Sequence, residues 1–324
     1  GTPYFYRIVA KAGDNLSNEE TTQITPVFSS EIITTPVVEL HPTSAILGGE
    51  ITSDGGGEIT ARGVCWSTSA NPTINDSKTQ AGNGIGLFVS TLTGLTNNTM
   101  YYAKAYSINS AGTSYGNEIS FKTYFREVTD IEGNVYPTVK IGEQIWMAEN
   151  LKVTKYNDGE DIANITNNDS WTNLKTGAYS WYDNDTENKD SYGALYNWHA
   201  VNTGKLAPEG WHIPTYEELN IFLETLGGKA VAGSKMKTKD GWETGNNESN
   251  NSSRFNGLPG GSRHYNGTFN QIGEVGIWWS ATAANSISGW HFTLSADSIS
   301  VFMNYALKER GRSVRCILGK NSVP

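Results

Sequence analysis

Two adjacent tryptophans, Trp278 and Trp279, constrain the fold of this chain more than any other feature of its sequence. They lie in the strand-like run Gly276–Thr282 (GIWWSAT). Because successive side chains of a β-strand point to opposite faces, the two indole rings must lie on different sides of a sheet. We expect one ring to fill a core and the other to lie at a surface or under a loop, and we predict that the pair is structural.

The charge and hydropathy of the chain exclude two classes of partner. Its 324 residues carry a net charge of −9 and no basic cluster, so a nucleic acid would be repelled and is not expected as a partner. No apolar run approaches the roughly 18–20 residues that span a bilayer, so no membrane span is expected in this segment. Because the chain begins at Gly1 without a signal-peptide pattern, we expect it to start inside a longer gene product.

A repeat near the N-terminus indicates two sandwich domains of one type. Residues 2–10 align with residues 99–107, and Thr25 aligns with Thr123, which gives an offset of 97 to 98 residues. That offset is about the length of one β-sandwich domain. Both copies alternate apolar and polar residues, as half-buried strands do, and each is followed by a polar turn and a second strand.

The second copy of the repeat is complete. With the run Gly94–Tyr102 (GLTNNTMYY), and with Ser110–Gly112 before its last strand, it resembles a fibronectin type III domain over residues 31–124. The resemblance implies an all-β sandwich that serves as a spacer or adhesion module. Clusters of glycine, asparagine and serine separate the predicted strands, which are Pro36–Leu40, Ser44–Ile51, Ile59–Ser67, Leu87–Leu92, Thr99–Ile108 and Tyr115–Lys122.

Residues 1–26 then correspond to the last two strands of a preceding fibronectin type III-like domain, and residues 27–124 to a complete one. Two strands alone are marginally stable in water. We expect that the rest of the preceding domain has been removed. The alternative is that another chain completes this hairpin, which would make it a site of self-association.

The composition changes at Phe125, where a third domain, residues 125–320, is predicted to begin. Nine of the ten tryptophans follow this point. Thr215 and Glu218 form a capping box that predicts one helix, and a second short helix is expected at Tyr192–Ala200. Few helices among many short strands indicate an α+β domain. The helix that begins after Thr215 has an apolar stripe of Leu219, Phe222, Leu223 and Leu226, and Gly227 is predicted to end it.

The segment from Glu127 to Leu318 resembles the Fibrobacter succinogenes major paralogous domain. Six motifs carry the resemblance in order, namely Thr138–Leu151, Tyr192–Trp198, Gly210–Thr215, Leu258–Arg263, Gly276–Thr282 and Gly311–Cys316. The resemblance implies a C-type lectin-like fold, similar to that of the relatives of formylglycine-generating enzyme. It also implies a place on exported, surface-associated bacterial proteins, but no defined biochemical activity.

The reactive residue types do not indicate an enzyme. Relatives that oxidise cysteine need a pair of site cysteines, whereas this domain contains only Cys316, because Cys65 belongs to the preceding domain. We expect both cysteines to be small buried hydrophobes. There is no Gly-x-Ser-x-Gly turn of a hydrolase, and His212 is expected to pack and form hydrogen bonds rather than to catalyse or bind metal.

An acidic loop is the best candidate for a metal site. Asp183, Asp185, Glu187 and Asp190 supply hard oxygen ligands at nearly alternate positions, which suits a calcium ion that takes roughly 6–8 oxygens. The loop lacks the central glycine of an EF-hand, and Lys189 interrupts it. The alternative interpretation is a solvated polar loop that contains Asx turns.

Aromatic and asparagine-rich loops are the candidates for ligand binding. Trp242, Tyr265 and Trp290 are predicted to contact a ligand, because exposed rings stack on sugar faces. Asn285 is predicted to contact it as part of an asparagine-rich loop. The competing interpretation is structural: in a domain with few strands, these large rings pack between the loops and hold them together. The resemblance to C-type lectin-like folds implies that the asparagine-rich loops form the ligand-facing surface; they are Gly245–Ser253, His264–Gln271 and Ala283–Gly289.

Together these patterns predict an extracellular or cell-surface bacterial protein without enzymatic activity. Sandwich domains would form its stalk, and a lectin-like head would bind a glycan or a protein ligand. One rival is a structural subunit of a surface appendage or phage-like particle, in which a neighbour completes the N-terminal hairpin. The second rival is an enzyme of the formylglycine-generating or hydrolytic type.

Overall fold

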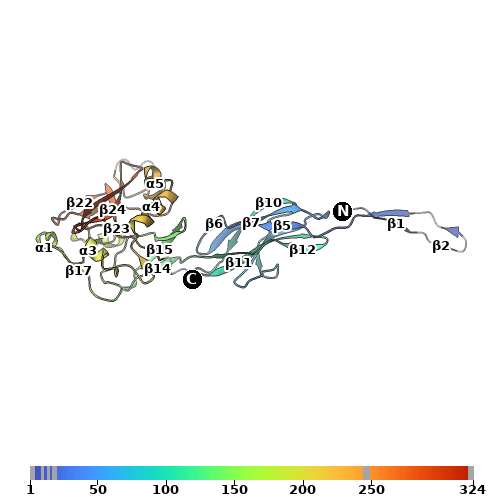
Figure 1. The fold of residues 1–324 in the computed structure, drawn as a ribbon, viewed down its shortest axis with the longest axis horizontal. Coiled ribbons are helices and arrows are strands. Elements are labelled where there is room, and N and C mark those ends of the chain that lie inside the picture. The colour runs from blue at the N-terminus through green and yellow to red at the C-terminus, as the bar shows by residue number, and fades with distance from the viewer. Residues whose placement is uncertain (1–3, 9–10, 13–14, 17–19, 244–248, 320–324) are drawn as a thin grey trace. The chain divides into compact units, whose positions relative to one another are not determined.

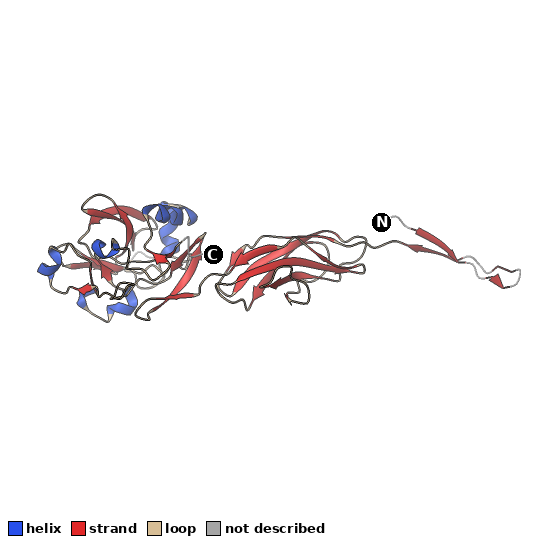
Figure 2. Ribbon diagram, turned by 60° about the horizontal axis from the view of Figure 1, so that its bottom comes forward, coloured by secondary structure: helices blue, strands red, loops and turns tan. Residues whose placement is uncertain are grey.

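A computed structural model describes residues 4–8, 11–12, 15–16, 20–243 and 249–319 of the chain. The chain divides into two compact units, Gly1–Phe125 and Arg126–Pro324. The first unit is built from strands, while the helices of the described residues all lie in the second (Figures 1 and 2). No described helix has the length and apolarity needed to cross a membrane.

The N-terminal segment forms the strand pair expected from the repeat. Strand β1 (Tyr4–Ile8) pairs antiparallel with β4 (Glu20–Ile24), in a register that sets Tyr4 opposite Ile24. Between them, β2 (Lys11–Ala12) pairs with β3 (Asn15–Leu16). The prediction of two paired strands in this segment is confirmed.

The rest of the first unit is a sandwich of two antiparallel sheets. Alternate residues of each strand point inward, so Leu47, Val64 and Leu92 meet in one core between the sheets. One sheet has the order β10 (Gly86–Thr93), β7 (Ser44–Ser53), β5 (Glu31–Thr34), with β6 (Glu39–Leu40) also on β7. The other has the order β12 (Gly112–Tyr115), β11 (Met100–Asn109), β8 (Ala61–Ser67), β9 (Ser77–Lys78), with β13 (Ile119–Lys122) also on β11.

Two predicted strands of the sandwich were wrong in extent. The run Tyr115–Lys122 divides into the end of β12 and all of β13. It breaks at Gly116, where a Cβ atom would lie 2.6 Å from the backbone nitrogen of Thr34. Asn117 follows and accepts a hydrogen bond from that same nitrogen at 3.1 Å. The run Pro36–Leu40 shortens to β6, and β5 was missed because its alternation is short.

The second unit combines three sheets with short helices. The largest sheet has the order β22 (Phe269–Ile272), β21 (Gly260–Arg263), β23 (Val275–Ala283), β24 (Ser288–Ser295), β25 (Val301–Leu307). A second has the order β14 (Glu127–Thr129), β15 (Val135–Ile141), β16 (Gln144–Met147), β26 (Ile317–Leu318), β20 (Trp211–His212). A small one joins β17 (Ala163–Asn164), β18 (Ala178–Ser180) and β19 (Leu195–Tyr196). The helices are α1 (Asn168–Thr172), η1 (Tyr182–Asn184), α2 (Asn188–Tyr192), α3 (Trp198–Val201), α4 (Tyr216–Thr225) and α5 (Lys229–Met236).

Helix α4 begins and ends as its sequence predicts. The hydroxyl of Thr215 accepts a hydrogen bond from the backbone nitrogen of Glu218 at 3.2 Å, and the Glu218 carboxylate accepts one from the backbone of Thr215 at 2.9 Å. Gly227 adopts a φ of 97°, a conformation that terminates helices and favours glycine. The four residues of the predicted apolar stripe are all buried.

The second predicted helix, Tyr192–Ala200, begins later than expected. Helix α3 covers only Trp198–Val201, because Leu195 and Tyr196 pair with β18 and Asn197 caps the helix by accepting from Ala200 at 3.0 Å. Helix α5 was not predicted at all. Its sequence (KAVAGSKM) has little amphipathic pattern, and the helix is stabilised by packing against β25.

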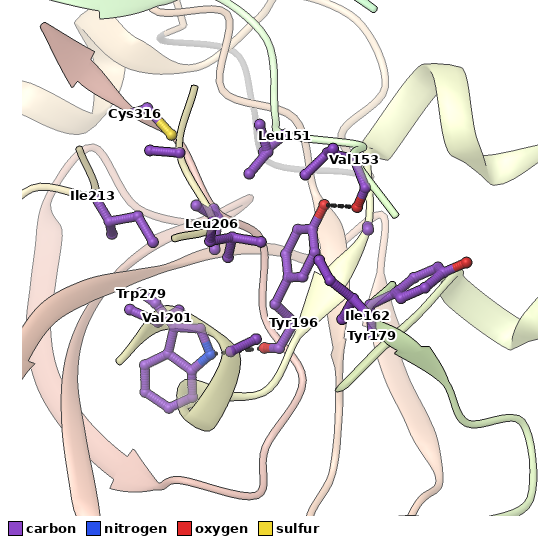
Figure 3. Packing of buried hydrophobic residues seen from close by; sticks show 14 of the residues in the cluster. Leu151, Val153, Ile162, Tyr179, Tyr196, Val201, Leu206, Ile213, Trp279 and Cys316 are labelled. Atoms are coloured by element: carbon purple, nitrogen blue, oxygen red, sulfur yellow. Dashed lines mark hydrogen bonds between the residues drawn. The ribbon is translucent and has the colours of Figure 1, made fainter. Parts of the chain in front are cut away.

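Trp278 and Trp279 face two different cores, as the strand alternation requires. Trp278 packs with residues of α4 and α5 and stacks on Phe292, with ring centroids 5.0 Å apart. Trp279 packs on the other side with α3, and its indole nitrogen donates to the carbonyl of Tyr196 at 2.9 Å (Figure 3). The expectation that one ring lies at a surface was wrong, since Trp278 is 1% and Trp279 0% exposed.

Both cysteines are free and buried, as predicted. Burial raises the pKa of the Cys65 thiol to about 11 and also raises that of Cys316. Both side chains therefore stay protonated at neutral pH and pack as small apolar groups.

Replacing Trp279 by Ala should destabilise the second unit by about 3–5 kcal/mol, because it leaves a cavity and an unpaired carbonyl at Tyr196. Denaturant unfolding followed by tryptophan fluorescence checks this. The variant Phe302→Ala is the control, because that ring is 51% exposed and should cost little. An unchanged midpoint for Trp279→Ala would show that the second core does not need this ring.

Candidate functional site

The second unit contains a cavity of about 740 Å³. Its walls come from segments far apart in the sequence: the chain just after β16, helix α2, the chain after α5, and the irregular segment before β26. The lining residues are Ala148, Glu149, Asn150, Asp190, Ser191, Tyr192, Gly193, Thr238, Lys239, Asp240, Gly241, Asn250, Asn251, Asn256, Leu258 and Arg315.

Asn150 organises the floor of this cavity. Its Oδ1 accepts hydrogen bonds from Trp278 Nε1 at 2.7 Å and from Arg315 Nη2 at 2.6 Å and Nε at 3.2 Å. Its Nδ2 donates to the carbonyl of Tyr192 at 2.8 Å. The floor is therefore tied directly to the tryptophan core, and such support preorganises a binding surface.

Arg315 brings a buried positive charge to the cavity. Its guanidinium lies 4.0 Å from the ring centroid of Phe255 and donates to the carbonyls of Phe255 and Asn256. Burial lowers its pKa, and the nearby carboxylate of Glu149 opposes that shift. Among the ion pairs of residues 20–243 and 249–319, none involves Arg315, so carbonyl and amide dipoles compensate its charge.

The upper walls carry side chains that suit a ligand rich in hydroxyls. Asn251 Nδ2 donates to Asn256 Oδ1 at 2.6 Å, and Asn250 Oδ1 accepts from the backbone nitrogen of Ser252 at 2.9 Å, so these amides are held in place. Each amide nitrogen has a second hydrogen to donate and each oxygen a second lone pair, and the carboxylate of Asp240 accepts. Asp240 is exposed, and its backbone carbonyl accepts from Thr238 at 2.8 Å, which orients this turn. The remaining walls add the aromatic ring of Tyr192 and the aliphatic side chains of Ala148 and Leu258.

The structure does not gather the predicted calcium ligands into one set. Asp185 Oδ1 accepts from the backbone nitrogen of Glu187 at 2.9 Å, an Asx turn, and Asp183 lies in η1 with a φ of 52°. Asp190 forms an ion pair with Lys152 at 3.0 Å, and that contact lowers its pKa. Over the described ranges, no three acidic, histidine or cysteine side chains converge as metal ligands. Of the four carboxylates only Asp190 lines the cavity, and calcium binding by this loop stays a prediction.

The four residues predicted to contact a ligand lie in different surroundings. The indole nitrogen of Trp242 donates to Thr238 at 3.1 Å, and the ring packs near Lys237, beside the cavity wall. Tyr265 lies in the turn after β21, against His264, with a centroid distance of 4.1 Å. Asn285 is exposed in the β23–β24 turn and accepts from Ile287 at 2.9 Å. Of the loop Gly245–Ser253, residues 245–248 lie outside the described residues.

Trp290 lies in strand β24 and not in a loop. Its ring contacts Tyr216, with centroids 4.6 Å apart, and Tyr305, with centroids 5.6 Å apart. None of the four predicted ligand residues lines the cavity. The lining residues Asn150 and Arg315 were missed as site residues, although both lie in motifs that carry the family resemblance.

Comparison with known proteins agrees with this architecture. The model of the Fibrobacter succinogenes major domain matches residues 139–318. This chain belongs to that family. The matched region includes every residue that lines the cavity, and the family assignment confirms the resemblance carried by the six motifs. No curated protein matches the chain.

Several solved structures resemble a part of the chain that is about as long as one domain. The sensor domain of the anti-sigma factor RsgI4 of Pseudobacteroides cellulosolvens is 22% identical, with 31% of this chain and 98% of that chain covered and a TM-score of 0.24. A fibronectin type III domain of the human KIAA0970 protein is 15% identical, with 32% and 79% covered and a TM-score of 0.24. Scores this low carry no argument about function, and the sandwich assignment depends on the strand pairing described above.

His212 has the structural role that its sequence position predicts. Its Nε2 lies 2.9 Å from Oε1 of Glu218, which joins β20 to the first turn of α4. Burial raises the pKa of Glu218, but hydrogen bonds from His212 and Thr215 outweigh this effect and hold the pKa at about 2. Because the folded pKa lies below the unfolded value, the carboxylate stabilises the fold above about pH 4.5 and loses this effect toward pH 2.

We therefore expect the second unit to lose more stability between pH 5 and pH 2 in the natural protein than in the variant Glu218→Gln. Urea unfolding at several pH values measures this. The variant Glu217→Gln, at an exposed neighbouring position, should follow the natural protein. Equal acid sensitivity of both variants would show that the contact between His212 and Glu218 is not the cause.

Proposed function

We propose that this chain is the ligand-binding part of an extracellular bacterial surface protein and that it has no enzymatic activity. The family assignment and the presence of a fibronectin type III-like sandwich support an extracellular place. We also propose that the second unit has a C-type lectin-like fold, which its few helices and twisted sheets favour. The sandwich then serves as a spacer, and the second unit binds the ligand.

The observation that carries this proposal is the cavity. Binding sites for small ligands are concave, and a few convergent polar groups give them their specificity. Here Asn150 holds the floor in place, while amides and the exposed carboxylate of Asp240 form the walls. The described lining contains no cysteine, which the formylglycine-generating alternative would use, and no histidine, which the hydrolytic alternative would use.

A glycan fits this cavity better than a protein does. Amide and carboxylate side chains form paired hydrogen bonds with adjacent sugar hydroxyls, and Tyr192 offers an apolar ring beside them. A protein partner commonly buries about 800 Å² on each side, with an apolar centre. The cavity is a small concavity with a mixed polar and apolar lining, so we propose that it binds one or a few sugar residues.

A glycan array with the full chain should identify oligosaccharides that bind, and Asp240→Ala should weaken that binding roughly tenfold, because a charged hydrogen bond is lost. Isothermal titration measures the change. Asp169→Ala removes an exposed carboxylate of α1 away from the cavity and should bind as the natural protein does. A blank array, or equal affinities of the two variants, would argue against the cavity as the site.

One observation favours a second candidate function, that of a structural subunit that assembles with copies of itself. In the described part of the chain, β10 pairs with β7 alone and is therefore an edge strand. Natural edge strands are commonly protected by charges, proline or bulges. The β10 sequence (GLFVSTLT) has no charge and no proline, its register with β7 is unbroken, and Leu87 and Val89 are each 69% exposed.

If β10 pairs with β10 of a second copy, the sedimentation coefficient of the full chain should rise with concentration. Val89→Lys should abolish this rise, because pairing would bring like charges together. Ile33→Lys is the control, since Ile33 lies on the same sheet face but on β5. A natural chain that stays monomeric at high concentration would exclude this second candidate.

A further inference from the structure

Three aromatic side chains form a cluster at one end of the largest sheet of the second unit. Trp290 of β24 lies between Tyr216, the first residue of α4, and Tyr305 of β25. Lys229 Nζ lies 6.0 Å from the ring centroid of Tyr216. No residue of this aromatic cluster lines the cavity, so the cluster is a separate feature of the surface.

The cluster is exposed because the helical cover of the sheet ends there. Val301, Met303 and Tyr305 alternate along β25 and share the sheet face that α4 and α5 cover. Val301 and Met303 pack into the core under the helices. Tyr305 lies beyond this cover and is 54% exposed, so the sheet face continues into solvent as an aromatic surface.

The indole N–H of Trp290 distinguishes this ring from the structural tryptophans. The indole nitrogens of Trp171, Trp198 and Trp279, for example, each donate to a backbone carbonyl at 2.7–2.9 Å. Within residues 20–243 and 249–319, Trp290 has ring contacts but no partner for its N–H. The ring is only half-buried, so this donor is left available at the protein surface.

We propose that the aromatic cluster of Tyr216, Trp290 and Tyr305 is a second carbohydrate-binding site, on which a sugar ring of a polysaccharide stacks. Aromatic side chains combine an apolar face with a polar edge. The faces contact the C–H groups of a pyranose ring, while the Trp290 N–H and the two tyrosine hydroxyls form hydrogen bonds with its hydroxyls.

The chemistry of the cluster favours a sugar over a protein partner. The patch is only three rings wide, and a stable protein interface needs a much larger apolar centre. Each of its rings carries its own polar group, as a ligand with alternating C–H and O–H groups requires. A polysaccharide could engage this open surface along its length, whereas the cavity would receive a short piece or an end.

The test is affinity electrophoresis of the full chain in gels that contain a soluble β-glucan, xylan, mannan or galacturonan. We expect at least one of them to retard the natural chain, and Tyr305→Ala to weaken that interaction about two- to tenfold. Trp290→Phe keeps a ring in place and should also reduce the retardation. In addition, the change in tryptophan fluorescence on binding should be smaller in Trp290→Phe.

Two controls separate this site from its surroundings. Phe302→Ala removes a ring of similar exposure from β25, but from the opposite sheet face, and should leave the retardation unchanged. Asp169→Ala, an exposed carboxylate of α1 outside the cavity lining, should also leave it unchanged. Asp240→Ala run in the same gels makes a failure of the cavity proposal and a failure of this one distinguishable, because it reduces retardation only if the cavity binds, whereas Tyr305→Ala reduces it only if the aromatic cluster binds. The proposal would be overturned if none of the four polysaccharides retarded the natural chain, if Tyr305→Ala and Trp290→Phe both migrated like it, or if Phe302→Ala lost binding equally.

Discussion

The second unit depends most on the side-chain amide of Asn150. One oxygen accepts from Trp278 and from two nitrogens of Arg315, and the nitrogen of the same amide donates to the backbone of Tyr192. These bonds join the chain just after β16 to β23, to the irregular segment before β26 and to α2. A buried indole N–H and a buried guanidinium are costly without partners, so one short side chain compensates both and at the same time shapes the floor of the cavity.

The two tryptophans of β23 explain why core and site are coupled. Trp278 contacts Phe255 and Phe292 under α4 and α5, while Trp279 contacts the opposite core near Tyr196 (Figure 3). Arg315 stacks on Phe255, so the aromatic core beneath the cavity also positions its charge. Any binding at the cavity is therefore supported by residues that are buried and that hold few alternative rotamers.

Local sequence patterns predicted those elements in which local and tertiary forces agree. The capping box at Thr215 and Glu218, with its apolar stripe, predicted α4, and the strand alternation placed the two indole rings on opposite faces. The same reasoning missed α5, whose weak pattern is stabilised by contacts with β25, and extended α3 over residues that pair with β18. The prediction of site residues was weaker. The patterns that indicate ligand binding are exposed aromatic and acidic loops, whereas Asn150 and Arg315 are buried.

The sequence by itself determined the family, the division into a sandwich unit and a second unit of sheets with few helices, and the faces of β23, because these follow from motifs and from periods of two or 3.6 residues. Only the tertiary structure decided where a ligand can lie. It brought Asn150, Asp240 and Arg315 to one cavity across more than a hundred and sixty residues of chain. Among the residues that the structure describes, it also left the N–H of Trp290, beside Tyr305, without a partner. Such proximities depend on how sheets and helices pack against one another, which no local pattern encodes.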